Sequence, residues 1–201
     1  PLQFKYMNKI YTPTEFAKKI IKFNPEDYIE ITSYQHHDFY KKFILEIPDN
    51  WSHDQYYNVP VEDMLKIMRH AIKNNHSIVW CGDISEGNFS FHLKFGAIRL
   101  KKSDSLLLKR DAQKYRQYTF DNFTTTDDHL MHLIGLAKNK KGKLFFLAKD
   151  SSGPNCNKYG GYLYMSQEYI KLKTIAIMVN KKAIPKAIAQ RLLFNRRLSE
   201  K

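Results

Sequence analysis

The sequence predicts an α+β fold in which an antiparallel β-sheet carries helices to one side. Two observations predict it. Several segments alternate polar and apolar residues with a period of two, whereas the segments with helical spacing are separate from them. Polar turns, some with glycine, lie between the strand-like segments of the second half. The chain has 201 residues, of which 43% are hydrophobic, enough for one sizeable core.

The first element is a helix that begins at a capping box. Thr12 is its N-cap, Pro13 stands at the first helical position, where no N–H is needed, and Glu15 closes the box. We expect this helix to extend to about Phe23.

A strand, a helix and a second strand follow. Residues 27–34 alternate polar and apolar side chains, with β-branched and aromatic types among them, which is typical of a half-buried strand. Residues 61–72 place apolar side chains at helical spacing, and Asn74-Asn75 ends that pattern before the apolar strand 78–80.

The sequence predicts mainly strands in the second half of the chain. Residues 89–95 alternate again, and residues 106–116 resemble a basic amphipathic helix or a helical loop. A hairpin is predicted next, with strands 128–137 and 143–149 joined through the polar turn 138–142.

The last elements are short. The sequence predicts strands over 162–165 and 174–179, separated by a turn. Pro185 then opens a basic helix over 187–198.

The net charge is confined to one half of the chain. Lys and Arg number 33 and Asp and Glu 20, a net +13; residues 1–100 hold 12 of each sign, and residues 101–201 hold 21 basic and 8 acidic residues. Clusters of Lys and Arg in residues 101–201 can bind nucleic acid weakly and without specificity. No zinc-finger, RRM or helix-turn-helix signature accompanies them, so we interpret them chiefly as a solvated surface.

Cysteine, histidine and hydropathy patterns exclude other classes. Cys81 and Cys156 lack the paired spacing of a disulfide framework or a zinc site, and they leave the compartment open. The neighbours His36 and His37, with His53, have no carboxylate at helical or hairpin spacing, so we expect solvated loop histidines, no metal and no cofactor. The longest aliphatic run near the end, 175–179, is far short of the roughly 20 residues that span a bilayer.

Two motifs resemble the papain-like cysteine peptidases. The segment 128–136, Asp-His-Leu-Met-His-Leu-Ile-Gly-Leu, is similar to the histidine strand of that family. Lys149-Asp150-Ser151-Ser152-Gly153 follows with Asp150 at 150 − 129 = 21 positions after His129, and it resembles the family's Lys-Asn-Ser-Trp-Gly motif. Gly160-Gly161-Tyr162 then matches the Gly-Tyr that opens the next strand in the family.

The resemblance extends to the bleomycin hydrolase and aminopeptidase C group over roughly residues 10–190. It rests on the order and spacing of Thr12-Pro13-Thr14-Glu15-Phe16, Asp27-Tyr28, Asn58-Val59-Pro60, Ile78-Val79-Trp80, Thr125-Thr126-Asp127-Asp128-His129 and Asn180-Lys181-Lys182-Ala183-Ile184-Pro185.

This resemblance implies the C-terminal, β-barrel half of a papain-like fold with flanking helices. The implied division is a helical lead-in 1–26, a β-barrel domain 27–183 with insertions near 35–58 and 100–126, and a basic C-terminal helix and tail 184–201.

The implied activity is thiol-dependent peptide hydrolysis of an aminopeptidase type. His129 is then the acid and base, and Asp150 orients the imidazole, so we expect the two side chains to lie side by side on adjacent strands. Two positions depart from the family: Asp150 replaces Asn, and Ser152 replaces the Trp that covers the hydrogen bond. His132, at an odd offset along the strand, is expected on the opposite face.

The nucleophile is not found in its family context. Cys81 ends a strand, where we expect a small buried hydrophobe, and Cys156 follows the orienting position, where we expect an exposed thiol. Since the chain opens at Pro1, we expect a fragment or processed chain that is completed by a Cys-bearing N-terminal half of the same protein.

The resemblance also implies a peptide substrate and assembly into a homo-hexamer. Two alternatives stay open: a catalytically degenerate papain-like module for interaction, and a basic nucleic-acid-binding module.

Overall fold

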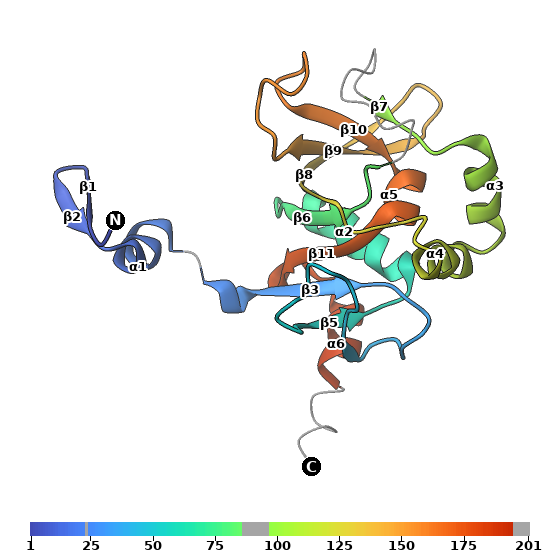
Figure 1. Ribbon diagram of the computed structural model, residues 1–201, viewed down its shortest axis with the longest axis horizontal. Helices are drawn as coiled ribbons and strands as arrows, with labels where there is room; N and C mark the ends of the chain where they lie inside the picture. The colour runs from blue at the N-terminus through green and yellow to red at the C-terminus, as the bar shows by residue number, and fades with distance from the viewer. Residues whose placement is uncertain (23, 86–96, 195–201) are drawn as a thin grey trace.

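The computed structural model describes residues 1–22, 24–85 and 97–194. The expected strand over 89–95 and the last residues of the expected C-terminal helix lie outside this range. Within it, one large sheet and the helices packed against it form the body of the molecule, and the predicted α+β class is confirmed (Figure 1).

The main sheet has nine strands in the order β4-β5-β3-β11-β6-β8-β9-β10-β7. The strands are β3 (Tyr28–Thr32), β4 (Lys42–Ile44), β5 (Gln55–Asn58), β6 (Ile78–Gly82), β7 (Ala97–Ile98), β8 (His129–Lys138), β9 (Leu144–Asp150), β10 (Tyr162–Ser166) and β11 (Thr174–Asn180).

The sheet differs from the expectation in two respects. Most neighbours are antiparallel, but β3 pairs with β5 and β10 pairs with β7 in parallel. The pair β3 and β5 is parallel because β4 lies between them in the chain and pairs antiparallel with β5. The sheet order ends at β4 and β7, so the described strands form an open sheet, not the closed barrel that the resemblance implies.

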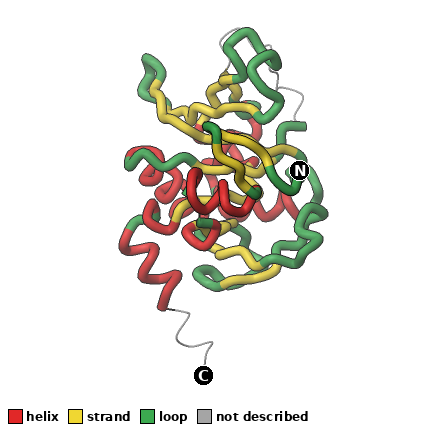
Figure 2. The backbone as a smooth tube through the Cα atoms, turned by 90° about the vertical axis from the view of Figure 1, so that its left-hand side faces the viewer, coloured by secondary structure: helices red, strands yellow, loops and turns green. Residues whose placement is uncertain are grey.

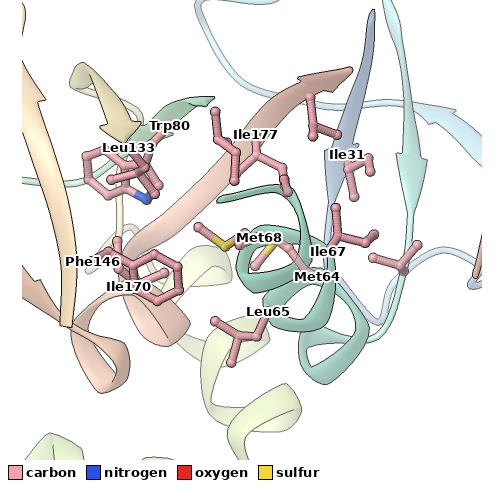
Figure 3. Close-up of a cluster of buried hydrophobic side chains, with 14 of the residues drawn as sticks. Ile31, Met64, Leu65, Ile67, Met68, Trp80, Leu133, Phe146, Ile170 and Ile177 are labelled. Carbon is pink, nitrogen blue, oxygen red and sulfur yellow. The ribbon is translucent and has the colours of Figure 1, made fainter. Parts of the chain in front are cut away.

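The predicted helix over 61–72 is confirmed as α2 (Val61–Lys73), which ends at Asn74. Its apolar face supplies Met64, Leu65, Ile67 and Met68 to the core, where they meet side chains from the sheet and from helix α5 (Gln167–Lys173) (Figure 3). The partners labelled there are Ile31, Trp80, Leu133, Phe146, Ile170 and Ile177. Trp80 also donates its indole N–H to Thr174 Oγ1 at 2.7 Å.

The other helices correct two sequence expectations. The single helix expected over 106–116 is two helices, α3 (Lys102–Arg110) and α4 (Ala112–Asp121), because Asp111 leaves the helical conformation and caps α4 at Lys114 N. The turn expected between the last two strands is helix α5 (Gln167–Lys173), capped by Ser166. α5 is only seven residues long, too short for a helical period to show in the sequence.

The final described helix, α6 (Lys186–Phe194), belongs to the body of the molecule. Its residues Ile188 and Leu192 are buried in the main core. In the view turned by 90°, α6 lies at the lower end of the molecule, where the described chain stops (Figure 2). Among the described residues, no helix has the length and apolar character needed to cross a membrane.

The N-terminal elements stand to one side of the body (Figure 1). A hairpin of β1 (Phe4–Tyr6) and β2 (Lys9–Tyr11) precedes α1 (Pro13–Phe16), which continues as a π-helix over Ala17–Ile21. The predicted capping box between Thr12 and Glu15 is confirmed. Phe16 contacts the rings of Phe4, Tyr6 and Tyr11 edge-on, so this unit has a small aromatic centre of its own.

Candidate active site

The hairpin of β8 and β9 brings His129 and Asp150 together. His129 is the first residue of β8 and Asp150 is the last of β9. The register pairs Asp150 with Met131, and His129 shares the face of Met131 because side chains alternate along a strand. His129 Nε2 lies 2.9 Å from Asp150 Oδ2, as the sequence predicts.

The Asp150 carboxylate is held from two directions. Its Oδ2 contacts the imidazole, and its Oδ1 accepts a hydrogen bond from the backbone N–H of Ser152 at 2.7 Å. Burial raises the pKa of the Asp150 carboxyl, but hydrogen bonds from Ser152 and His129 outweigh that effect and leave this pKa below its ordinary value. The side chain of Asp150 is fully buried while that of His129 is 17% exposed, so the ring is fixed from inside and reachable from outside.

The loop after Asp150 is shaped by residues that sequence reasoning missed. The Asn157 side chain accepts hydrogen bonds from the N–H groups of Tyr159 and Gly161 and donates to the carbonyl of Tyr162. Gly161 approaches so closely that an added Cβ would lie 2.6 Å from the Gly153 carbonyl oxygen. An Asn inside a glycine-rich turn is the only signal of this role in the sequence.

His132 lies on the other face of β8. It is exposed, whereas its neighbours Met131 and Leu133 are buried. The expectation for this residue is confirmed, and His132 is not part of the His129 site.

Cys81 is on the wrong face to act with His129. Its backbone pairs with Leu130, so its side chain lies on the face opposite to that of His129 and Met131. The thiol donates to Asp127 Oδ1 at 2.5 Å, and burial, followed by this carboxylate, raises the pKa of Cys81 far above its ordinary value. Cys81 is therefore a half-buried hydrogen-bonding thiol, not the purely apolar residue that its position at a strand end suggested.

Cys156 also lacks the features of a nucleophile. It lies in the loop after Asp150 and is half-buried, where the sequence predicted an exposed thiol. Burial and the negative charge of Asp150 both raise its pKa. An activated thiol needs a positive neighbour that lowers its pKa, which is the opposite environment.

One group of side chains has the composition of a metal site. The ligand atoms of His36, His37 and Glu46 all lie within 4.8 Å of one another. His53, which the sequence placed with the two histidines, is not in this group. The sequence analysis did not consider Glu46, which follows β4 and lies nine residues after His37 and ten after His36. The chain reverses through the loop before β4, and this places the Glu46 carboxylate beside the two histidines.

A cavity of about 720 Å³ lies elsewhere, between β3, β5, β11 and α6. Tyr28, Tyr57 and Met178 are among its lining residues, and neither His129 nor Asp150 is. The cavity is therefore separate from the imidazole and carboxylate pair.

Comparison with known proteins gives one family. The model of the peptidase C1-like family matches residues 3–196. A search of curated proteins found no match.

One solved structure supports the same fold. PepW from Lactobacillus rhamnosis superposes with a TM-score of 0.72 at 19% identity, over 98% of this chain and 47% of that chain. Bromelain protease from Ananas comosus, solved with the E64 inhibitor, gives a TM-score of 0.36 at 14% identity, over 58% of this chain and 45% of that chain. The chain therefore spans just under half the length of the PepW chain.

Proposed function

This chain belongs to the peptidase C1-like family, and from that premise we propose that it supplies the histidine half of a papain-like cysteine peptidase of the bleomycin hydrolase type. The single observation that carries the proposal is the 2.9 Å contact between His129 Nε2 and the buried Asp150 carboxylate.

The proposed chemistry follows from that contact. A thiol becomes a good nucleophile when an imidazole takes its proton and the imidazolium then holds the thiolate. Asp150 accepts the Nε2–H of His129 and fixes the ring, so that Nδ1 is the atom that exchanges a proton with the thiol. The same imidazolium then returns the proton to the amine that leaves when the peptide bond breaks.

The nucleophile in this proposal comes from a Cys-bearing N-terminal half of the same protein. Two findings support an outside source: Cys81 lies on the opposite face of the sheet, and both thiols have raised pKa values. The chain's coverage of 47% of the PepW chain is consistent with a second half of similar size.

The finer assignment rests on the sequence resemblance. Bleomycin hydrolases and the aminopeptidase C group remove residues from peptide ends, and they assemble as hexamers around an inner cavity. We extend both properties to the complete protein: a peptide substrate, an aminopeptidase specificity and a homo-hexamer.

A second candidate function is a catalytically degenerate module that keeps the fold for interaction. The observation that favours it is the pair of departures at Asp150 and Ser152. The carboxylate at position 150 adds a negative charge beside the imidazole, and Ser152 cannot shield the hydrogen bond as an indole ring does.

A reconstituted enzyme tests the first function against the second. A longer chain that joins the Cys-bearing half to residues 1–201 is assayed on aminoacyl-coumarin reporters, beside the 201-residue chain alone. We expect hydrolysis by the longer chain only. His129→Ala should reduce its rate by about 10²-fold or more, since general acid and base catalysis contributes that much.

His132→Ala is the matched control, because this histidine lies on the same strand but on the exposed face. It should leave the rate within about twofold of the parent. Iodoacetamide-sensitive hydrolysis by the 201-residue chain, abolished by Cys81→Ser or Cys156→Ser, would refute the outside nucleophile. A longer chain that is folded but inactive would instead establish the degenerate module.

A further inference from the structure

Two histidines and a glutamate converge beside edge strand β4. His37 Nε2 lies 3.0 Å from Glu46 Oε1, and His36 Nε2 lies 3.2 Å from Glu46 Oε2. The three side chains are between 32% and 57% exposed, so solvent reaches the point where they meet. This group is separate from the His129 and Asp150 pair and has no part in the proposed hydrolysis.

The backbone that carries the two histidines is held by a buried amide. Asn58 is fully buried at the end of β5 and bonds both backbone groups of Tyr34, accepting from its N–H at 2.9 Å and donating to its carbonyl at 2.8 Å. The same side chain donates to the carbonyl of His37 at 2.9 Å. On the other side, Leu45 is buried next to Glu46, and its carbonyl accepts from Asn50 at 2.9 Å.

The imidazole rings are also fixed by their neighbours. His37 stacks on Phe43 with 4.2 Å between ring centroids, and His36 stacks on Phe120 at 6.0 Å. His36 Nδ1 lies 3.0 Å from Gln117 Nε2 and 3.3 Å from Gln117 Oε1, and that oxygen also accepts from the N–H groups of Gln35 and His36. In the nearer contact the Gln117 amide donates to His36 Nδ1, so that Nε2 carries the proton that faces Glu46. A metal ion at Nε2 would replace that proton, and the ring would then carry its proton on Nδ1, where Gln117 Oε1 at 3.3 Å can accept it.

From these contacts we infer that His36 Nε2, His37 Nε2 and the Glu46 carboxylate form a binding site for a divalent transition-metal ion of the zinc type. A tetrahedral zinc with bonds of about 2.0–2.1 Å separates its ligand atoms by about 3.3 Å. Here each imidazole Nε2 lies 3.0 or 3.2 Å from a different oxygen of Glu46, and the three ligand atoms lie within 4.8 Å of one another, so one ion can be placed between them. Two imidazoles and one carboxylate suit zinc or copper, whereas magnesium and calcium prefer oxygen ligands alone. Water would complete the coordination on the exposed side.

Two features argue for a specific site over adventitious attraction. The chain carries a net charge of +13, which repels cations in general. His36 and His37 lie in the loop after β3, and Glu46 lies in the segment after edge strand β4. A bound ion would therefore hold that loop against the edge of the sheet. The ligand chemistry therefore predicts stabilisation on metal binding.

Zinc titration of the untagged 201-residue chain by calorimetry tests the site. We expect one saturable Zn²⁺ per chain and a higher unfolding temperature in its presence. Glu46→Gln keeps the shape of the side chain but removes the anionic ligand, and His37→Asn removes one imidazole. Each should weaken Zn²⁺ binding by about tenfold or more.

His53→Asn is the matched control, an exposed loop histidine outside the group, and it should bind as the parent does. Copper EPR gives a second readout, with two nitrogen donors in the parent and one in His37→Asn. The inference is wrong if the parent shows no saturable Zn²⁺ binding, if Glu46→Gln binds as tightly as the parent, or if His53→Asn loses as much affinity as His37→Asn.

Discussion

A carboxylate at position 150 has a consequence that an amide in the same place lacks. Asp150 accepts from the imidazole through Oδ2 and from the Ser152 backbone N–H through Oδ1. An Asn has one acceptor oxygen and an NH₂ donor, so it can satisfy only one of these two N–H groups. Asp150 departs from the Asn of the family motif, but it satisfies the two N–H groups around it better than an Asn would.

We therefore expect Asp150→Asn to lower the free energy of unfolding at pH 7 by about 1–3 kcal/mol, the cost of leaving one buried donor without an acceptor. The effect should depend on pH. Because the folded-state pKa of Asp150 is below the unfolded value of about 3.9, its contribution is present above about pH 4 and is lost as pH falls through the lower folded pKa.

Urea unfolding at pH 7 and at pH 3 measures this difference. The gap between parent and Asp150→Asn should narrow at the lower pH. Asp38→Asn is the control: this residue pairs with Lys41 on the surface, and its replacement should change little. An Asp150→Asn variant as stable as the parent at pH 7 would mean that the two contacts to the carboxylate contribute nothing.

At the level of elements, one buried arginine ties helix α4 to the sheet. Arg116 is 1% exposed and donates to the carbonyls of Lys171, Leu172 and Thr174 at 2.7, 3.1 and 2.7 Å. It also donates to the carbonyl of Ser33, after β3, at 3.4 Å. One guanidinium thus joins the segment after β3, the end of α5 and the start of β11.

Arg116→Lys should lower the free energy of unfolding by about 1–3 kcal/mol. Lysine keeps the charge, but its single ammonium group cannot donate to all four of these carbonyls at once. Some of the buried carbonyl oxygens therefore lose their donor. Arg110→Lys, at the exposed end of α3, is the matched control and should change stability little. Equal urea midpoints for the two variants would show that the Arg116 contacts do not hold α4 in place.

At the level of the whole molecule, the charge of residues 101–201 is the property most visible in the sequence and the least tied to the site. The basic residues of the loop between β8 and β9 are exposed, Lys140, Lys141 and Lys143 among them. Such a surface attracts polyanions without reading their sequence.

We predict weak nucleic-acid binding that falls steeply between low and physiological salt, because the binding releases counterions. Heparin should compete as well as an oligonucleotide does, and single and double strands should bind alike. Fluorescence titrations against several oligonucleotides at rising salt measure it. Tight binding at physiological salt with a preference for one sequence would favour the nucleic-acid-binding alternative.

Elements that depend on neighbours along the chain could be predicted from the residues alone. The capping box at Thr12, the helical spacing of α2 and the polar turn 138–142 between the two strand segments that form β8 and β9 are local signals, and each predicted its element. The His129 and Asp150 pair was also predictable, through a motif resemblance together with a hairpin that brings its two ends together.

Features that need contacts between distant segments became visible only in the folded chain. The edges of the sheet depend on which strand pairs with β5 and β10, and α5, with only seven residues, is too short to show a helical pattern. The meeting of His36 and His37 with Glu46 depends on a loop that the Asn58 amide holds in shape. The physical reason is common to these cases: periodicity reports which face of an element is buried, whereas the partner that covers it comes from long-range packing.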